Sequence, residues 1–308
     1  MPMLKIRKSD GDHINELSTY EEGVWVQLTQ PTNQELNEVA EALNVEMDYL
    51  RAALDEEERA HIDTDNGQTL VIVDIPVIDD DSGYSTIPLA IVMTKTALIT
   101  VCLRDTNLLQ PFAEGKVKTF TTQFKTRFLL QILYRNAVHY LIYLKQIDKL
   151  SSQIEGVLHK SMRNKELIEM LKLEKSLVYF STSLKSNETV LERLARYDYV
   201  KKYPEDRELL DDVITENKQA IEMANIYSSI LSGTMDAFAS IISNNLNIVM
   251  KLLASVTIVM SIPTMIASFF GMNVDMPFNT SGAFWPIVGA SLLASFVVGY
   301  ILYKKDLF

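Results

Sequence analysis

The sequence contains only one cysteine, Cys102, in 308 residues. A single cysteine excludes an internal disulfide and a cysteine-based zinc site. The sequence has four histidines, whose spacing does not match that of metal ligands: His13, His61, His139 and His159. The sequence also lacks a glycine-rich phosphate-binding loop, a nucleophile elbow and a His/Asp/Ser grouping. We therefore expect neither an enzyme nor a nucleotide partner.

Charged residues are scarce at the C-terminal end of the chain. Of 29 basic and 40 acidic residues, five lie beyond residue 246, namely Lys251, Asp275, Lys304, Lys305 and Asp306. Residues 1–246 therefore hold 26 basic and 38 acidic residues, a net charge of −12. Nucleic-acid binding depends on Lys and Arg, so this acidic part argues against a nucleic-acid partner. Residues 1–20 lack the apolar segment of a signal peptide, and we expect the N-terminal part in the cytosol.

Two long uncharged runs predict a pair of membrane helices. Residues 252–274 and 276–303 contain no charged side chain, and each run exceeds the ~20 residues that cross a bilayer as a helix. Two buried core helices are a weaker alternative for runs of this length. Lysines flank the pair on its outer ends and are absent from the connector, which by the positive-inside rule places both termini in the cytosol. We expect the lipid bilayer as a partner, with spans at 251–270 and 284–303, an outer loop at 271–283 and a cytosolic tail at 304–308.

The part before the membrane divides into two blocks by pattern. Residues 1–118 predict a small α/β domain. Strands are expected at 24–28, 69–78, 87–93 and 97–103, and helices at 33–43 and 46–54. Thr32 and Glu35 match a capping box at the start of the first helix.

From residue 119 the pattern is helical. Residues 119–203 predict a helical hairpin with helices near 129–158 and 165–200, and a stalk helix covers 204–250, starting at Pro204. The stalk carries a heptad-like alternation of apolar and small residues. If it continues into the first span, the helix covers ~60 residues and needs partner subunits to bury its faces. The expected fold class is thus an α+β cytosolic domain followed by long stalk helices and a two-helix transmembrane hairpin.

A polar stripe follows one face of the first span. Its members recur at spacings of three and four, and they are Asn247, Met250, Ala254, Thr257, Ser261, Thr264 and Ser268. Small hydroxyl residues of this kind often pack membrane helices together. In a ring of subunits the same face would line a pore with neutral oxygen ligands, which suit a hydrated Mg²⁺ ion. The stripe alone leaves both readings open.

The end of this span resembles a known family. Residues 264–273 read Thr-Met-Ile-Ala-Ser-Phe-Phe-Gly-Met-Asn, with Pro263 before them and Met276-Pro277 after them. This segment is similar to the end of the first span of CorA-type magnesium channels, whose signature is Gly-Met-Asn. A looser resemblance extends over the whole chain. It implies a funnel-shaped homopentamer in the plasma membrane of a bacterium, with stalk helices and first spans around one axial pore.

The resemblance also implies roles for individual residues. Asn273 would ring the outer mouth and bind the ion through its water shell, Gly271 would let the chain turn off the helix, and Met272 would wedge the loop. The pore-lining set would comprise Asp236, Asn247, Met250, Leu253, Thr257, Ser261 and Thr264. Asp211 and Asp212 are candidates for regulatory sites that sense cytosolic Mg²⁺, and a solvated acidic face is at least an equal reading of this pair.

Three functions compete at this stage. The first is Mg²⁺ influx through a channel gated by cytosolic Mg²⁺, so that Mg²⁺ is both transported and regulatory. The second is a Zn²⁺, Co²⁺ or Ni²⁺ transporter of the same architecture, although softer metals usually recruit imidazole or thiolate and the pore region has neither. The third is a membrane-tethered scaffold without conduction. Phe270 replaces a tyrosine common in the family, and the outer loop has a single acid, Asp275, so the apparent cation affinity stays open.

Overall fold

The computed structural model describes residues 3–11, 13–79, 83–161, 164–197, 200, 202–272 and 284–305. The chain divides into two compact units, Met1–Gly233 and Thr234–Phe308. The first unit contains the whole sheet.

Within the described residues, seven strands form one sheet in the order β2-β1-β3-β7-β6-β5-β4. The strands are β1 (Met3–Asp10), β2 (His13–Leu17), β3 (Val24–Thr29), β4 (His61–Asp65), β5 (Gln68–Asp79), β6 (Gly83–Met93) and β7 (Ala97–Cys102). The pair β3–β7 is parallel, and the other pairs are antiparallel. The four predicted strands are confirmed as β3, β5, β6 and β7.

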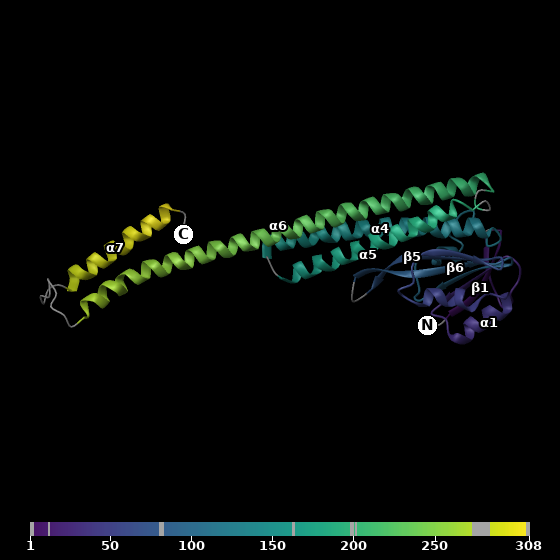
Figure 1. The fold of residues 1–308 in the computed structure, drawn as a ribbon, viewed down its shortest axis with the longest axis horizontal. Coiled ribbons are helices and arrows are strands. Elements are labelled where there is room, and N and C mark those ends of the chain that lie inside the picture. Colours follow the sequence, from purple (N-terminus) through teal and green to yellow (C-terminus); the bar gives the residue numbers. More distant parts are fainter. Residues whose placement is uncertain are drawn as a thin grey trace. The chain divides into compact units, whose positions relative to one another are not determined.

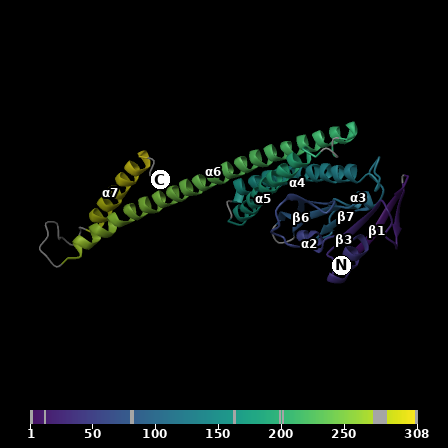
Figure 2. The same ribbon diagram turned by 45° about the vertical axis from the view of Figure 1, so that its right-hand side comes forward.

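Short helices cover one face of the sheet (Figures 1 and 2). Helix α1 (Asn33–Leu43) has the predicted bounds, and Thr32 and Glu35 form the predicted capping box. The helix predicted at 46–54 is divided into α2 (Met47–Arg51) and a 3-10 turn, η1 (Ala52–Leu54). Leu36, Val39 and Leu50 of these helices share a buried cluster with the sheet residues Ile72 and Ile99.

Long helices cover the opposite face (Figures 1 and 2). They are α4 (Lys125–Ser161) and α5 (Asn164–Leu194), preceded by the one-turn helix α3 (Gln110–Ala113). Phe128 of α4 packs edge-on against Trp25 of β3, with 5.2 Å between ring centroids. These helices and the sheet share one buried core. The residues before position 118 and the helices after it therefore fold together.

Helix α6 (Pro204–Phe270) runs unbroken for 67 residues, as expected if the stalk continued into the first span. Its heptad positions from Leu210 to Leu231 are buried, except Tyr227, which is partly buried. Asn217 donates to the Leu184 carbonyl of α5, and Ser232 donates to the Glu174 carboxylate of α5 at 2.6 Å. Much of this face therefore packs on α5 of its own chain between residues 210 and 231. Helix α7 (Phe284–Lys304) follows the predicted second span.

Candidate functional site

Two described helices, α6 and α7, are long and apolar enough to cross a membrane. Helix α7 and the C-terminal part of α6 lie in the second unit, over the almost uncharged part of the sequence. Large apolar side chains on both helices are exposed, including Leu253, Met260 and Phe296. Such surface is costly in water and favourable in hydrocarbon.

Helix α7 packs on α6 through small residues. Ser291 and Ser295 of α7 and Ser255 of α6 are buried. A β-carbon built on Gly299 would lie 3.8 Å from Val259 Cγ2, so α7 lies against the Val259 side chain of α6 here.

The polar stripe points away from this contact. Asn247, Met250, Leu253, Thr257 and Thr264 are exposed within the single chain, and Ser261 is partly exposed. Packing against α7 therefore does not account for the stripe. Asp236 is also exposed, and its carboxylate lies on α6 about eleven residues before Asn247.

The hydroxyl groups of the stripe bond to their own helix. Thr257 Oγ1 donates to the Leu253 carbonyl at 2.8 Å, Ser261 Oγ to the Ile258 carbonyl at 2.8 Å, and Thr264 Oγ1 to the Met260 carbonyl at 3.3 Å. A hydroxyl has one proton, so these oxygens keep only acceptor lone pairs for other partners. Water bound to a metal ion points its protons outward. The stripe is therefore chemically suited to accept hydrogen bonds from a hydrated cation.

The Gly-Met-Asn segment is described only up to Met272. Gly271 donates to the Ala267 carbonyl at 3.0 Å and directly follows the last residue of α6. A β-carbon at Gly271 would lie 3.4 Å from that carbonyl oxygen, and the residue does not adopt a left-handed φ. Met272 is exposed, and Asn273 lies outside the described residues.

Asp211 and Asp212 lie near the start of α6, in the first unit. They line a hollow of about 380 Å³ together with Lys202, Arg207 and Glu208. Among the described residues, no group of three or more His, Cys, Asp or Glu side chains could hold a metal ion. Within the described chain this pair therefore does not form a metal site by itself, and Lys202 and Arg207 lie beside it.

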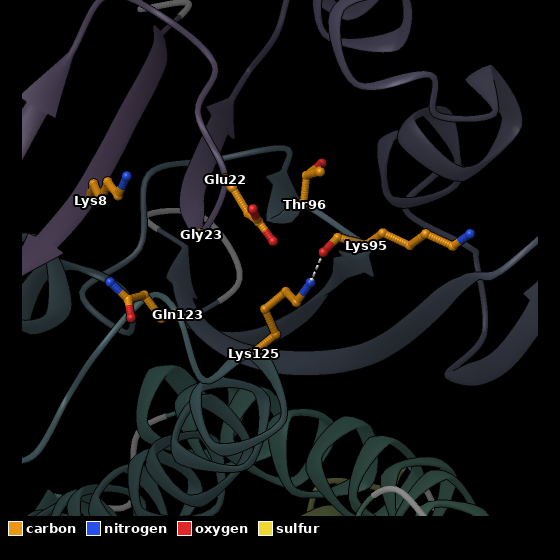
Figure 3. Close-up of a pocket in the computed structure, with 7 residues that line it drawn as sticks. All are labelled: Lys8, Glu22, Gly23, Lys95, Thr96, Gln123 and Lys125. Carbon is orange, nitrogen blue, oxygen red and sulfur yellow. Dashed lines mark hydrogen bonds between the residues drawn. The ribbon is translucent and has the colours of Figure 1, made fainter.

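A second hollow, of about 370 Å³, lies where α4 begins (Figure 3). Lys125 donates to the backbone carbonyls of Thr94 and Lys95, while the Lys95 side chain points away from it. Burial lowers the pKa of Lys125, and the Glu22 carboxylate opposes this effect. Lys8 pairs with Glu21 at 2.8 Å. Lys8 is therefore engaged by an acid and Lys125 by two carbonyls, and Lys125 ties α4 to the β6–β7 turn.

Sequence reasoning missed one polar cluster, around Asp74 of β5. Asn136, Tyr140 and Asn187 of α4 and α5 converge on its backbone. The sequence signal was weak, because an aspartate within the apolar run of residues 69–78 and two asparagines within long helices are each unremarkable alone.

Comparisons with known proteins agree with this arrangement. A family model described as "CorA-like Mg2+ transporter protein" matches residues 20–304. The "Cobalt/magnesium transport protein CorA" of Methanocaldococcus jannaschii is 26% identical over 297 residues, covering 92% of this chain and 90% of that protein.

Solved structures show the same fold. The complete structure of the CorA magnesium transporter from Methanocaldococcus jannaschii matches with a TM-score of 0.86 at 23% identity, covering 100% of both chains. The full-length CmaX protein matches with a TM-score of 0.74 at 12% identity, covering 100% of this chain and 98% of the other. The expected fold class is confirmed for one chain: a sheet-containing N-terminal domain, a long helix and a C-terminal helix that could cross the membrane.

Proposed function

This chain belongs to the family of CorA-like Mg2+ transporter proteins, and on that premise we propose that it forms a homopentameric channel for Mg²⁺ influx. In this proposal α6 and α7 span the membrane, both termini are cytosolic, and the α6 helices surround the pore. The membrane potential drives entry, at about 2.3 kcal/mol per unit charge for each 100 mV.

One observation carries the proposal: the polar stripe of α6 is exposed although α7 is already packed on the helix. A helix face with three hydroxyl acceptors needs a polar environment in a bilayer, because lipid offers it none. A water-filled path shared by several subunits provides that environment. Neutral acceptors also hold a divalent ion less tightly than carboxylates would, which favours passage.

Further residues take roles along this path. Asn273 would form the outer ring and accept from the water shell of the ion. Met250 and Leu253, which are 56% and 60% exposed in the single chain, would form an apolar constriction that closes by dewetting. Asp236 would place a ring of carboxylates on the same helix and attract cations.

We propose that cytosolic Mg²⁺ closes the channel by binding between subunits near Asp211 and Asp212. The motivation is that this acidic pair is incomplete as a metal site within one chain, so a neighbouring subunit would have to add ligands. Replacing both residues by Asn should weaken inhibition of uptake by millimolar internal Mg²⁺. Unchanged inhibition in that variant would remove this pair from the gating proposal.

Ion uptake into proteoliposomes tests the proposed function. Purified protein in vesicles with an inside-negative potential is assayed for uptake of Mg²⁺, Co²⁺, Ni²⁺ and Zn²⁺, alongside Asn273→Ala. The proposal expects Mg²⁺ uptake that collapses in the variant. Silence toward all four ions in a correctly assembled oligomer would contradict it and favour a non-conducting scaffold.

A second candidate is Co²⁺ transport by the same path. The motivation is that the M. jannaschii relative is named for both cobalt and magnesium. The pore stripe has no imidazole or thiolate to prefer a softer ion. Competition separates the two: Mg²⁺ as the physiological ion predicts that millimolar Mg²⁺ suppresses Co²⁺ uptake, whereas Co²⁺ uptake that resists Mg²⁺ would reverse the assignment.

A further inference from the structure

The contact between α7 and the C-terminal part of α6 brings lysines of both helices to one level. Helix α7 runs back alongside α6 (Figure 1), and a β-carbon on Gly299 would lie 3.8 Å from Val259 Cγ2. A helix rises about 1.5 Å per residue. Lys304 and Lys305 of α7 therefore lie level with α6 about five or six residues before Val259. Lys251 is two or three residues further, about 3 to 4.5 Å along the axis.

Lys251 also lies on the side of α6 that faces α7. It precedes Ser255 by four residues and Val259 by eight, and residues at this spacing share one face of a helix. Ser255 is buried, whereas Lys251, one turn further on, is exposed. Helix α7 ends at this level, at Lys304. The fold thus gathers basic side chains that lie 53 positions apart in the sequence.

Carboxylates do not balance these lysines within the described residues. The three lysines are exposed, and none has an ion-pair partner in the described part of the chain. Before Lys251 the nearest acid is Asp236, about 22 Å away along α6, and α7 contains no acid. Asp306 lies outside the described residues. This basic patch therefore stands out on a chain whose net charge is −11.

The aromatic residues of α7 place the basic patch at the surface of a bilayer. Trp285 and Tyr303, near opposite ends of α7, are 77% and 71% exposed. About 27 Å of helix separates them, close to the ~30 Å thickness of the hydrocarbon core. Trp and Tyr favour the two membrane interfaces. With Tyr303 at one interface, Lys304 and Lys305 lie among the lipid headgroups, and their alkyl stems remain in apolar surroundings.

We propose that Lys251, Lys304 and Lys305 form a binding site for the phosphate group of an anionic lipid in the cytosolic leaflet. The leaflet rests on the proposed function, in which both termini are cytosolic. Charge complementarity favours this occupant, because a zwitterionic lipid balances its phosphate with its own ammonium group. A lipid held by lysines from both helices would link α6 to α7 at the inner membrane surface.

Native mass spectrometry of the full-length protein in detergent tests the site. The probes are phosphatidylglycerol and phosphatidylcholine with identical acyl chains. Phosphatidylglycerol should bind at least about tenfold more tightly, and Lys251→Gln should weaken its binding about fivefold, the contribution of one lysine near an anionic surface. Lys304→Gln combined with Lys305→Gln should weaken it further. Lys218→Gln is the matched control, an exposed lysine of α6 in the first unit, and should leave the lipid preference unchanged.

Two further measurements separate a lipid site from other uses of the lysines. Replacing all three lysines by arginine keeps the charge and should keep the preference, whereas replacing all three by glutamine should make the two lipids bind equally. Calorimetry with inorganic phosphate at fixed ionic strength should show no binding comparable to that of phosphatidylglycerol. Comparable binding would assign the lysines to a soluble anion and overturn the lipid site.

Equal affinity for the two lipids in the unmodified protein would also overturn the inference, as would a preference that survives the glutamine variants. Lipid affinity is measured without ion flux. A failed lipid site therefore leaves the channel proposal intact, and absent Mg²⁺ uptake with an intact lipid preference would contradict the channel alone.

Discussion

Three hydroxyl side chains on α6 use their only proton within their own helix. Thr257, Ser261 and Thr264 each donate to a carbonyl three or four residues earlier. The residue types and their spacing were visible in the sequence, and so was their common face. The sequence did not show to which acceptor each hydroxyl donates, because helix packing and pore lining use the same residue types. The bonds to the helix itself make these oxygens acceptors.

Thr257→Val tests the value of one such acceptor. The change keeps the shape of the side chain and removes the oxygen. We expect Mg²⁺ uptake to fall about tenfold, corresponding to about 1.4 kcal/mol for one lost hydrogen bond to the hydrated ion. Thr215→Val is the matched control, because Thr215 Oγ1 makes the same 2.8 Å bond to the Asp211 carbonyl, outside the span. Equal uptake in both variants would contradict the assignment of Thr257.

Asn187→Ala tests the two hydrogen bonds between the Asn187 side chain and the Asp74 backbone at the edge of β5. Alanine leaves the Asp74 N–H without a partner and removes one donor from its carbonyl. The free energy of unfolding of the first unit should fall by about 2 kcal/mol, the cost of an unsatisfied buried group. Denaturant unfolding followed by circular dichroism measures this. Asn225→Ala, which loses an exposed bond from Ser181, should cost well under half as much, and a similar loss in both would argue against a special role for Asn187.

The pairing of Asp74 with Asn187 also shows why the sequence alone did not predict this polar cluster. Asp74 and Asn187 are separated by 113 positions, and no local pattern links them. Their pairing follows from β4 ending early and α5 crossing the exposed edge, which are facts of tertiary structure. Local rules succeeded where the partners are three residues apart, as in the capping box of Thr32 and Glu35.

Among the elements, the sequence predicted those with strong apolar periodicity. Strand β7 and helix α1 lie within a residue of their predicted bounds, because β7 is a continuous buried apolar run and α1 buries Leu36 and Val39 at helical spacing. Strands β1, β2 and β4 were missed. Strand β2 has no buried residue and β4 has only Ile62, since β2 and β4 are edge strands with limited contact to the core. In β1 the buried Arg7 stacks on Trp25 at 5.2 Å, an arrangement that hydrophobic patterning does not detect.

Arg127 joins the starts of α4 and α6 through ion pairs with Asp206 and, at 3.6 Å, with Glu205, which gives a prediction at the element scale. Arg127 Nε lies 2.7 Å from Asp206 Oδ1, and the Asp206 side chain is only 4% exposed. Arg127→Met would leave this carboxylate buried without its partner. We expect a loss of about 2 kcal/mol in unfolding free energy, less than for a fully buried pair because Arg127 is partly exposed.

Two further variants check the source of that loss. Lys165→Met removes an exposed pair with Glu169 at 3.9 Å and should change stability by under about 0.5 kcal/mol. Adding Asp206→Asn to Arg127→Met should recover part of the stability, because the unpaired charge is gone. No recovery in the double variant would show that the arginine acts through packing rather than charge.

At the scale of the whole molecule, charge divides the chain into an acidic part and an almost uncharged part. The acidic part up to residue 246 and the almost uncharged remainder were evident from composition, and α6 and α7 bear out two candidate spans. Subunit number follows from contacts between chains, which one sequence does not encode as a local pattern. The exposed Ile226 and Ile230 of α6, 54% and 55% accessible in the single chain, are the apolar surface that such contacts would cover.

Cysteine accessibility tests most directly whether the polar face of α6 lines the ion path. The background is low because the only native cysteine, Cys102, is buried. Thr257→Cys and Val259→Cys are treated in proteoliposomes with a charged, water-soluble thiol reagent while Mg²⁺ uptake is recorded. Modification of Thr257→Cys should block uptake, and Val259→Cys, on the face that packs against Gly299, should be unaffected. Block at position 259 with none at 257 would contradict the account.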